Sequence, residues 1–387
     1  MHLYTLVALP LVVHLLGTTS AADPAIKEKS AMIQAAFLVG WAIGGAFFGR
    51  LGDLIGRSRA LALTVLTYAL CTGLCAIAQT WWQLMIFRFI AALGIGGEWA
   101  VGASLIVETW PKAWRPWLAA VLQSSVNVGI LLATVCVMLL YSLPHPPAER
   151  WVFLIGAFPA LLVFWIRRHV PETQEWKARG AGAERKPRMI TLFQGPVGAI
   201  TFRTTLVCAL ALSAWWLFLF WHPQHLRQIL TESGASRSEI TRWISISFFA
   251  VNGASIAGNF FAGWIASRLS CQRAIAIMLG GLALGIVGAF VVPRSFGALA
   301  WFWCPFTGFF SGAFGLFTMY LPPLFPTLLR TTGAGFCYNI GRICAAGASV
   351  IFGWFAPVND FRTALLASSL VAMAAFVAAF WLPKDAT

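Results

Sequence analysis

The stretch Gly49–Arg59, GRLGDLIGRSR, lies at the junction of two long apolar runs, Ala31–Gly52 and Ala60–Gln79. Each run holds roughly 20 residues, enough for a helix to cross the roughly 30 Å hydrocarbon core of a bilayer. Runs of this kind recur along nearly the whole chain. The stretch therefore predicts two membrane-spanning helices that are joined by a charged turn at the membrane surface.

The composition supports a membrane protein along its whole length. Of the 387 residues, 59% are hydrophobic and only 10% are charged, and the mean hydropathy is +0.78. Soluble domains use roughly 45–50% apolar and about 25% charged residues. Strands of a membrane barrel would alternate over about ten residues, and the sequence shows no such alternation. These values exclude a soluble fold and predict an all-α membrane protein.

Twelve transmembrane helices are predicted, in two six-helix bundles at residues 1–168 and 201–387 with a polar cytoplasmic linker at 169–200. The first predicted span can also be interpreted as a signal peptide that ends near Ala22, but no Lys or Arg precedes its apolar run. The twelve spans are Met1–Thr19, Ala31–Gly52, Ala60–Gln79, Trp81–Trp110, Pro116–Tyr141, Trp151–Arg168, Phe202–His222, Arg242–Ser267, Ala274–Val292, Gly297–Leu321, Thr332–Phe355 and Phe361–Leu382.

The basic residues indicate the orientation of these spans. With a cytoplasmic N-terminus, 17 of the 27 Lys and Arg residues fall in inside loops and eight in outside loops, and Arg88 and Arg342 lie within spans. The positive-inside rule then places both termini in the cytoplasm. The formal net charge of +14 thus reflects topology and not a nucleic-acid-binding face. The eight cysteines lie almost entirely inside spans, and their spacing matches no metal site.

Glycine, proline and arginine at helix ends recur in the two halves, at offsets of 214 and 215 residues. The matched pairs are Gly44 with Gly258, Gly49 with Gly263, Arg59 with Arg273, Pro111 with Pro326, and Arg115 with Arg330. Parallel six-helix repeats of this kind are typical of secondary transporters whose substrate site lies near the membrane midplane. Because Pro10 matches Pro223 at an offset of 213, the repeat also predicts that the chain as given begins inside its first helix.

The stretch Gly49–Arg59 resembles the signature G-x-x-x-D-R-x-G-R-R of the major facilitator superfamily, with Leu54 in place of a common basic residue. The segments GIGGEW at Gly94–Trp99, ETWPKAWR at Glu108–Arg115 and PETQEWK at Pro171–Lys177 are similar to the sugar-porter branch and still more to the sialate and metabolite:proton symporters. The resemblance implies a secondary active transporter of the bacterial inner membrane, working by alternating access as a monomer, with a proton gradient and no cofactor or metal.

In this family, salt bridges at the cytoplasmic helix ends close the inner gate. Gly49 permits close helix approach, and Asp53 suits a helix N-terminus and a nearby arginine. A basic turn that only fixes topology is the alternative. The second half carries Ser267, Cys271 and Pro323 at the positions of Asp53, Arg57 and Glu108, so an asymmetric latch is expected. The expected gate residues are Gly49, Asp53, Arg57, Arg59, Glu108, Arg115, Glu172, Arg273 and Arg330.

Two ionisable residues inside spans are candidates for proton coupling. The resemblance assigns the counterpart of Arg88 to packing or proton handling, and the alternative is an arginine that bonds helix carbonyls. Glu98 lies near mid-membrane, where a carboxylate is costly and either protonates or finds a partner. A coupling role and a satisfied structural acid both stay open for Glu98.

Polar residues within spans indicate the substrate path, and Arg342 is the most informative of them. A cation in mid-span costs at least about 2.5–3.5 kcal/mol, and Thr332–Phe355 contains no Asp or Glu. A guanidinium can hold a carboxylate through two parallel hydrogen bonds. The alternative is an Arg342 bonded to Glu98 or to helix carbonyls. The candidate substrate residues are Gln123, Asn127, Trp215, Asn252, Asn339 and Arg342.

Together these features predict proton symport of a small organic anion, such as a monocarboxylate or an acidic sugar, across the lipid bilayer. A neutral sugar porter, an efflux antiporter and a non-transporting nutrient receptor stay as alternatives. Efflux is disfavoured because the stretch Ser125–Ile130 has no Pro and so lacks the Gly-Pro pair of drug antiporters. An enzyme is not expected, since the sequence has no cluster of nucleophiles or metal ligands.

Overall fold

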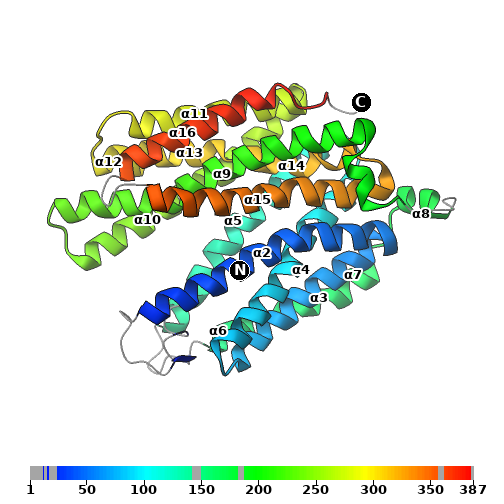
Figure 1. Ribbon diagram of the computed structural model, residues 1–387, viewed down its shortest axis with the longest axis horizontal. Coiled ribbons are helices and arrows are strands. Elements are labelled where there is room, and N and C mark those ends of the chain that lie inside the picture. The colour runs from blue at the N-terminus through cyan, green and yellow to red at the C-terminus, as the bar shows by residue number, and fades with distance from the viewer. Residues whose placement is uncertain are drawn as a thin grey trace. The chain divides into compact units, whose positions relative to one another are not determined.

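The computed structural model describes residues Val12, Leu15, Leu16, 24–141, 150–181, 187–355 and 361–384 (Figure 1). Within these residues the chain is helical apart from turns and short links. The α-helices are α2 Pro24–Ile55, α3 Arg57–Leu74, α4 Trp81–Thr109, α5 Arg115–Tyr141, α6 Arg150–Ile155, α7 Leu162–His169, α8 Gln174–Ala181, α9 Gly195–Glu232, α10 Arg237–Arg268, α11 Cys271–Phe290, α12 Phe296–Ala298, α13 Cys304–Phe310, α14 Ala313–Tyr320, α15 Arg330–Phe355 and α16 Phe361–Ala379.

The all-α membrane fold predicted from the sequence is confirmed. Among the described residues, eight helical segments are long and apolar enough to cross a bilayer. Each predicted span after the first coincides with one helix or with a run of shorter helices. The first span, Met1–Thr19, lies largely outside the described residues.

Two of the predicted spans are interrupted, and in each a proline lies at the interruption. In Gly297–Leu321, a π-helical segment at Leu299–Trp303 leads into α13 just before Pro305. In Trp151–Arg168, Pro159 lies in the 3₁₀ segment Phe158–Leu161 between α6 and α7. Proline lacks the backbone N–H and clashes with the carbonyl four residues earlier, so the α-helical ladder is broken there.

The chain divides into two compact units. The first contains residues 1–109, 128–189 and 325–339, and the second contains residues 110–127, 190–324 and 340–387. Each unit thus combines segments from both predicted six-helix bundles. The bundle boundaries themselves stay a prediction.

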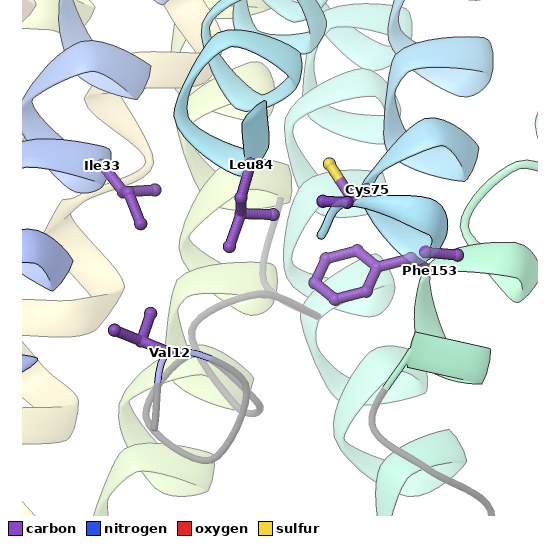
Figure 2. Packing of buried hydrophobic residues seen from close by; sticks show 7 residues of the cluster. Val12, Ile33, Cys75, Leu84 and Phe153 are labelled. Carbon is purple, nitrogen blue, oxygen red and sulfur yellow. The ribbon is translucent and has the colours of Figure 1, made fainter. Parts of the chain in front are cut away.

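In the first unit, α4 packs against both α2 and α3. At one end, an apolar cluster joins these helices to the start of α6, with Val12, Ile33, Cys75, Leu84 and Phe153 fully buried (Figure 2). The opposite ends of α2 and α4 carry charged residues instead, and the first residues of α15 join them there. The apolar cluster therefore fixes one end of this unit and leaves the polar contacts to the other.

In the second unit, α16 packs against α9 and α11, and α10 packs against α13. The first turns of α5 also belong to this unit and contact α10. A Cβ atom at Gly263 of α10 would lie 2.9 Å from the carbonyl oxygen of Pro116. Only glycine allows the two backbones to approach this closely.

The same close approach occurs in the first unit, at the positions that the repeat predicts. A Cβ atom at Gly49 of α2 would lie 2.8 Å from the carbonyl oxygen of Thr331 at the start of α15. Gly49 precedes Gly263 by 214 residues, and Pro116 precedes Thr331 by 215. The helix crossings therefore follow the offsets of the internal duplication.

Candidate functional site: a charged cluster and two polar helix crossings

The most strongly connected polar site in the described chain is a cluster around Glu108, at the end of α4. The Glu108 carboxylate has no exposed surface. It accepts hydrogen bonds from Nε and Nη2 of Arg57, at 3.1 and 2.9 Å, and from the Thr173 hydroxyl at 2.5 Å. Nη1 of Arg330 donates to the same carboxylate at 3.0 Å and to Glu175 at 2.6 Å. One buried carboxylate thus joins the first half of the sequence to the start of α15.

Asp53, at the end of α2, caps the N-terminus of α15. Its buried carboxylate accepts hydrogen bonds from the backbone N–H groups of Thr331 and Thr332, at 3.3 and 2.9 Å, and from the Thr332 hydroxyl at 2.5 Å. Nη2 of Arg57 lies 3.3 Å from the same carboxylate. A carboxylate at a helix N-terminus satisfies free N–H groups and interacts favourably with the helix dipole.

Glu172 caps a second helix, α3. Its carboxylate accepts hydrogen bonds from the backbone N–H groups of Arg57 and Ser58, at 2.7 and 3.3 Å. Gly56 precedes α3 with a φ of +108°, and a Cβ atom there would collide with Oε2 of Glu172. Glycine is therefore required at position 56 both by the backbone conformation and by the approach of the carboxylate.

These contacts define the charged cluster as Asp53, Arg57, Glu108, Glu172, Glu175 and Arg330. Its four carboxylates and two guanidinium groups leave a formal charge of −2, which the N-termini of α3 and α15 partly offset. Removing one partner from the buried members Asp53, Arg57 and Glu108 is costly, because the remaining charge loses its compensation. The cluster therefore favours the state in which α15 contacts α2 and α4.

The structure places the other predicted gate residues outside this cluster. Arg59 and Arg273 are exposed, and Nε of Arg115 donates to the carbonyl of Trp110 at 3.2 Å. Ser267, the repeat counterpart of Asp53, donates to Trp264 within its own helix. The carboxylate cap of α15 therefore has no counterpart at position 267, in line with the asymmetry expected from the sequence.

Sequence reasoning did not single out Thr173, Glu175, Thr331 or Thr332 as gate residues. Glu175 belongs to the quoted PETQEWK segment, one helical turn after Glu172, and nothing in the spacing shows which acid meets Arg330. Thr331 and Thr332 lie in the first turn of α15, and Asp53, the partner of Thr331, lies 278 residues away in sequence.

The two candidate coupling residues both lie in α4 and differ in their surroundings. Arg88 is buried, with its guanidinium 4.2 Å from the centre of the Phe37 ring of α2. This cation–π contact supports a packing role for Arg88. Glu98 is half-buried, and no hydrogen bond joins its carboxylate to the described residues.

In the second unit, the candidate substrate residues of α5 lie along a polar crossing with α10. The Asn127 amide donates to Ser255 at 3.1 Å, and Ser255 is 2.8 Å from the Ser311 hydroxyl. One turn earlier in α5, Ser124 accepts a hydrogen bond from the Asn259 amide of α10 at 3.1 Å. Both residues are buried. These bonds tie α5 to α10 much as the charged cluster ties α4 to α15.

Gln123 differs from these neighbours because its amide forms no hydrogen bond with the described residues. It is half-buried, and its Cβ lies 3.3 Å from the place that a Cβ at Gly315 of α14 would occupy. An amide in this setting has its hydrogen-bonding groups available for a solute. Gln123 is the candidate substrate residue whose environment best suits that role.

Among the remaining candidate substrate residues, Asn252 and Asn339 form hydrogen bonds within their own helices, and Trp215 packs against another ring. The Asn252 and Asn339 amides each donate at 2.8 Å to a carbonyl of their own helix, those of Phe248 and Gly335. Trp215 packs against the ring of Phe314, with centroids 6.1 Å apart. Arg342 is half-buried on α15, 215 residues after Asn127. It is thus the repeat counterpart of an asparagine that lies on the polar crossing.

The sequence and the fold match known transporters. A family model of the Major Facilitator Superfamily matches residues 4–336. The chain is 28% identical to the sialic acid transporter NanX of Escherichia coli K12, over 85% of this chain and 79% of that protein. It is 31% identical to a protein of Cupriavidus pinatubonensis named "Probable 4-methylmuconolactone transporter", over 90% of this chain and 80% of that protein.

Among solved structures, the proton:xylose symporter XylE has a similar fold. The TM-score is 0.80 over 99% of this chain and 93% of that chain, at 16% sequence identity. Relatives and structural neighbours are transporters and not enzymes, and the described helices are long and apolar enough to span a bilayer. As its motifs predicted, the chain belongs to the major facilitator superfamily and is a multi-span membrane transporter of small organic solutes.

Proposed function

We propose that this transporter carries a small organic anion, a monocarboxylate or an acidic sugar, by proton symport across the bacterial inner membrane. Arg342 is the observation that carries the proposal. It lies half-buried within α15, in a predicted span that contains no Asp or Glu. A guanidinium group can hold a solute carboxylate through a bidentate hydrogen bond, and the acidic solute named for the relative NanX supports this choice.

Alternating access accounts for the charged cluster. With both termini in the cytoplasm, as the basic loops indicate, Glu108 and Arg330 lie at the cytoplasmic ends of their helices. Contact between α15 and the α2–α4 pair then closes the route to the cytoplasm. Breaking the Asp53 and Arg330 contacts opens it, and each turnover makes and breaks the cluster once.

Uptake of labelled sialic acid and labelled xylose into proteoliposomes tests the substrate class. We expect uptake of the acid, driven by an inward proton gradient, and a loss of at least tenfold in Arg342→Lys, because lysine keeps the charge but not the planar fork. Arg362→Lys is the matched control, since the Arg362 guanidinium donates to the backbone carbonyls of Phe290 and Val291. Transport of xylose that survives Arg342→Gln would instead support the neutral sugar porter.

A further inference from the structure

An aromatic pair joins the same two helices that meet in the charged cluster. The indole of Trp99 in α4 and the phenol ring of Tyr338 in α15 stack face to face, with centroids 4.0 Å apart and ring planes within 10° of parallel. Trp99 precedes Glu108 by nine residues, and Tyr338 follows Arg330 by eight. At 1.5 Å per residue, the stack lies about 12–14 Å along the helices from the Glu108–Arg330 pair.

The backbones of the two helices are close at the level of the stack. Ala100 follows Trp99, and a Cβ atom at Gly335 of α15 would lie 2.9 Å from the Ala100 Cβ. The two rings therefore stack at a level where α4 and α15 contact each other directly. Any movement of α15 away from α4 has to separate them.

The contact between Trp99 and Tyr338 has one favourable and one unfavourable contribution to its free energy, and the Trp99 indole takes part in both. Aromatic stacking favours the contact beyond simple area burial. The indole Nε1 is buried, however, and it has no hydrogen-bond partner among the described residues. Burying an N–H donor without an acceptor is unfavourable. Separation of the rings would return this N–H group to water.

We propose that Trp99 and Tyr338 form a second, aromatic gate that opens together with the charged cluster. The unsatisfied indole N–H offsets the stacking, which keeps the closed and open states close in free energy. This inference rests on the proposed alternating-access function. It assigns the two residues a positioning role in the transport cycle, one that neither the motifs nor the charged cluster indicates.

Two substitutions separate the effect of the stacking from the effect of the buried indole N–H. They are expected to shift the ratio of open to closed states in opposite directions. Tyr338→Leu removes the stack but keeps the unsatisfied N–H, so the open state should gain roughly two- to tenfold in population ratio. Trp99→Phe keeps an aromatic ring but removes the N–H, so the closed state should gain roughly fivefold. A residue that only fills space would shift the balance the same way in both variants.

Two controls accompany these variants. Tyr338→Phe keeps the ring and removes only the hydroxyl, and it should leave the ratio within twofold of the parent. Trp264→Leu removes a stack between Phe261 and Trp264, which lie in the single helix α10 and have centroids 5.8 Å apart. Because that stack need not break during transport, this variant should also leave the ratio unchanged.

The ratio is measured by double electron–electron resonance on the full chain in proteoliposomes. One spin label replaces the exposed Thr109 of the first half, and the other replaces the exposed Leu269 of the second half. Opposite shifts in Trp99→Phe and Tyr338→Leu are expected. Equal shifts, or none, would overturn the aromatic gate. If the parent shows one fixed distance, and Glu108→Gln does not change it, the alternating-access function fails instead.

Discussion

Two glutamates of α4, Glu108 and Glu98, differ in the hydrogen bonds that their carboxylates accept. Glu108 is fully buried yet has four hydrogen-bond donor groups around it, from Arg57, Thr173 and Arg330. Glu98, ten residues earlier in the same helix, is half-buried without a hydrogen bond from the described residues. A carboxylate that is satisfied suits a structural or gating role, and one without partners suits a group that gains and loses a proton.

This difference leads to a prediction for Glu98. Glutamine resembles a protonated carboxyl group but cannot release a proton, so Glu98→Gln should abolish accumulation driven by a pH gradient and leave solute exchange at equal concentrations within about threefold of the parent. The measurement is uptake against counterflow in the same proteoliposomes. A parallel loss of both activities would show that Glu98 is a structural acid.

Among the helices, the sequence was enough to predict most of the spans and, for each contact of the charged cluster, the partner that lies in the first half. The motifs identified Asp53, Arg57 and Glu108 because their spacing at the ends of α2, α3 and α4 is a local property. The other half of each contact comes from the start of α15, more than 200 residues away. The repeat identified Arg330 there through its counterpart Arg115, but no local pattern indicated that Thr331 and Thr332 meet Asp53.

The two acids of the PETQEWK segment show a further limit of sequence reasoning. Glu172 was expected to form an inter-helix salt bridge, but in the structure it caps α3, and Glu175 meets Arg330. The two residues are three positions apart: Glu172 precedes α8, and Glu175 lies in its first turn. The sequence of the segment does not show which of the two acids meets an arginine.

The repeat shows where a carboxylate cap for α5 would lie, because Ser267 stands at the position equivalent to Asp53. Ser267→Asp places a carboxylate at the position equivalent to Asp53, near the N-terminus of α5, where it should favour the closed state by about 0.3–1 kcal/mol. The closed-to-open ratio should rise roughly two- to fivefold in the spin-label measurement. Ser270→Asp is the matched control, because Ser270 caps α11 within the second half. An equal shift in both variants would mean that charge alone, and not the α5 crossing, is responsible.

Across the molecule, the duplication supplies two helix crossings that share a close approach at a glycine and differ in their chemistry. One crossing is closed by the charged cluster at the α15 start, and the other by the amide and hydroxyl bonds of Asn127 and Asn259. Neutral hydrogen bonds are weaker than charge-assisted ones. The crossing of α15 with α2 and α4 therefore holds the stronger hydrogen bonds of the two.

If the charged cluster is a gate, Glu108→Gln has to change the spin-label distance between positions 109 and 269. The substitution weakens the contact with Arg330, which is about 1.5–3 kcal/mol for a hydrogen bond to a charged group. We expect a population ratio shifted roughly tenfold or more toward the longer distance. The control Arg59→Gln, at an exposed residue outside the cluster, should leave the ratio unchanged. A distance distribution in Glu108→Gln identical to that of the parent would contradict a gating role of the cluster.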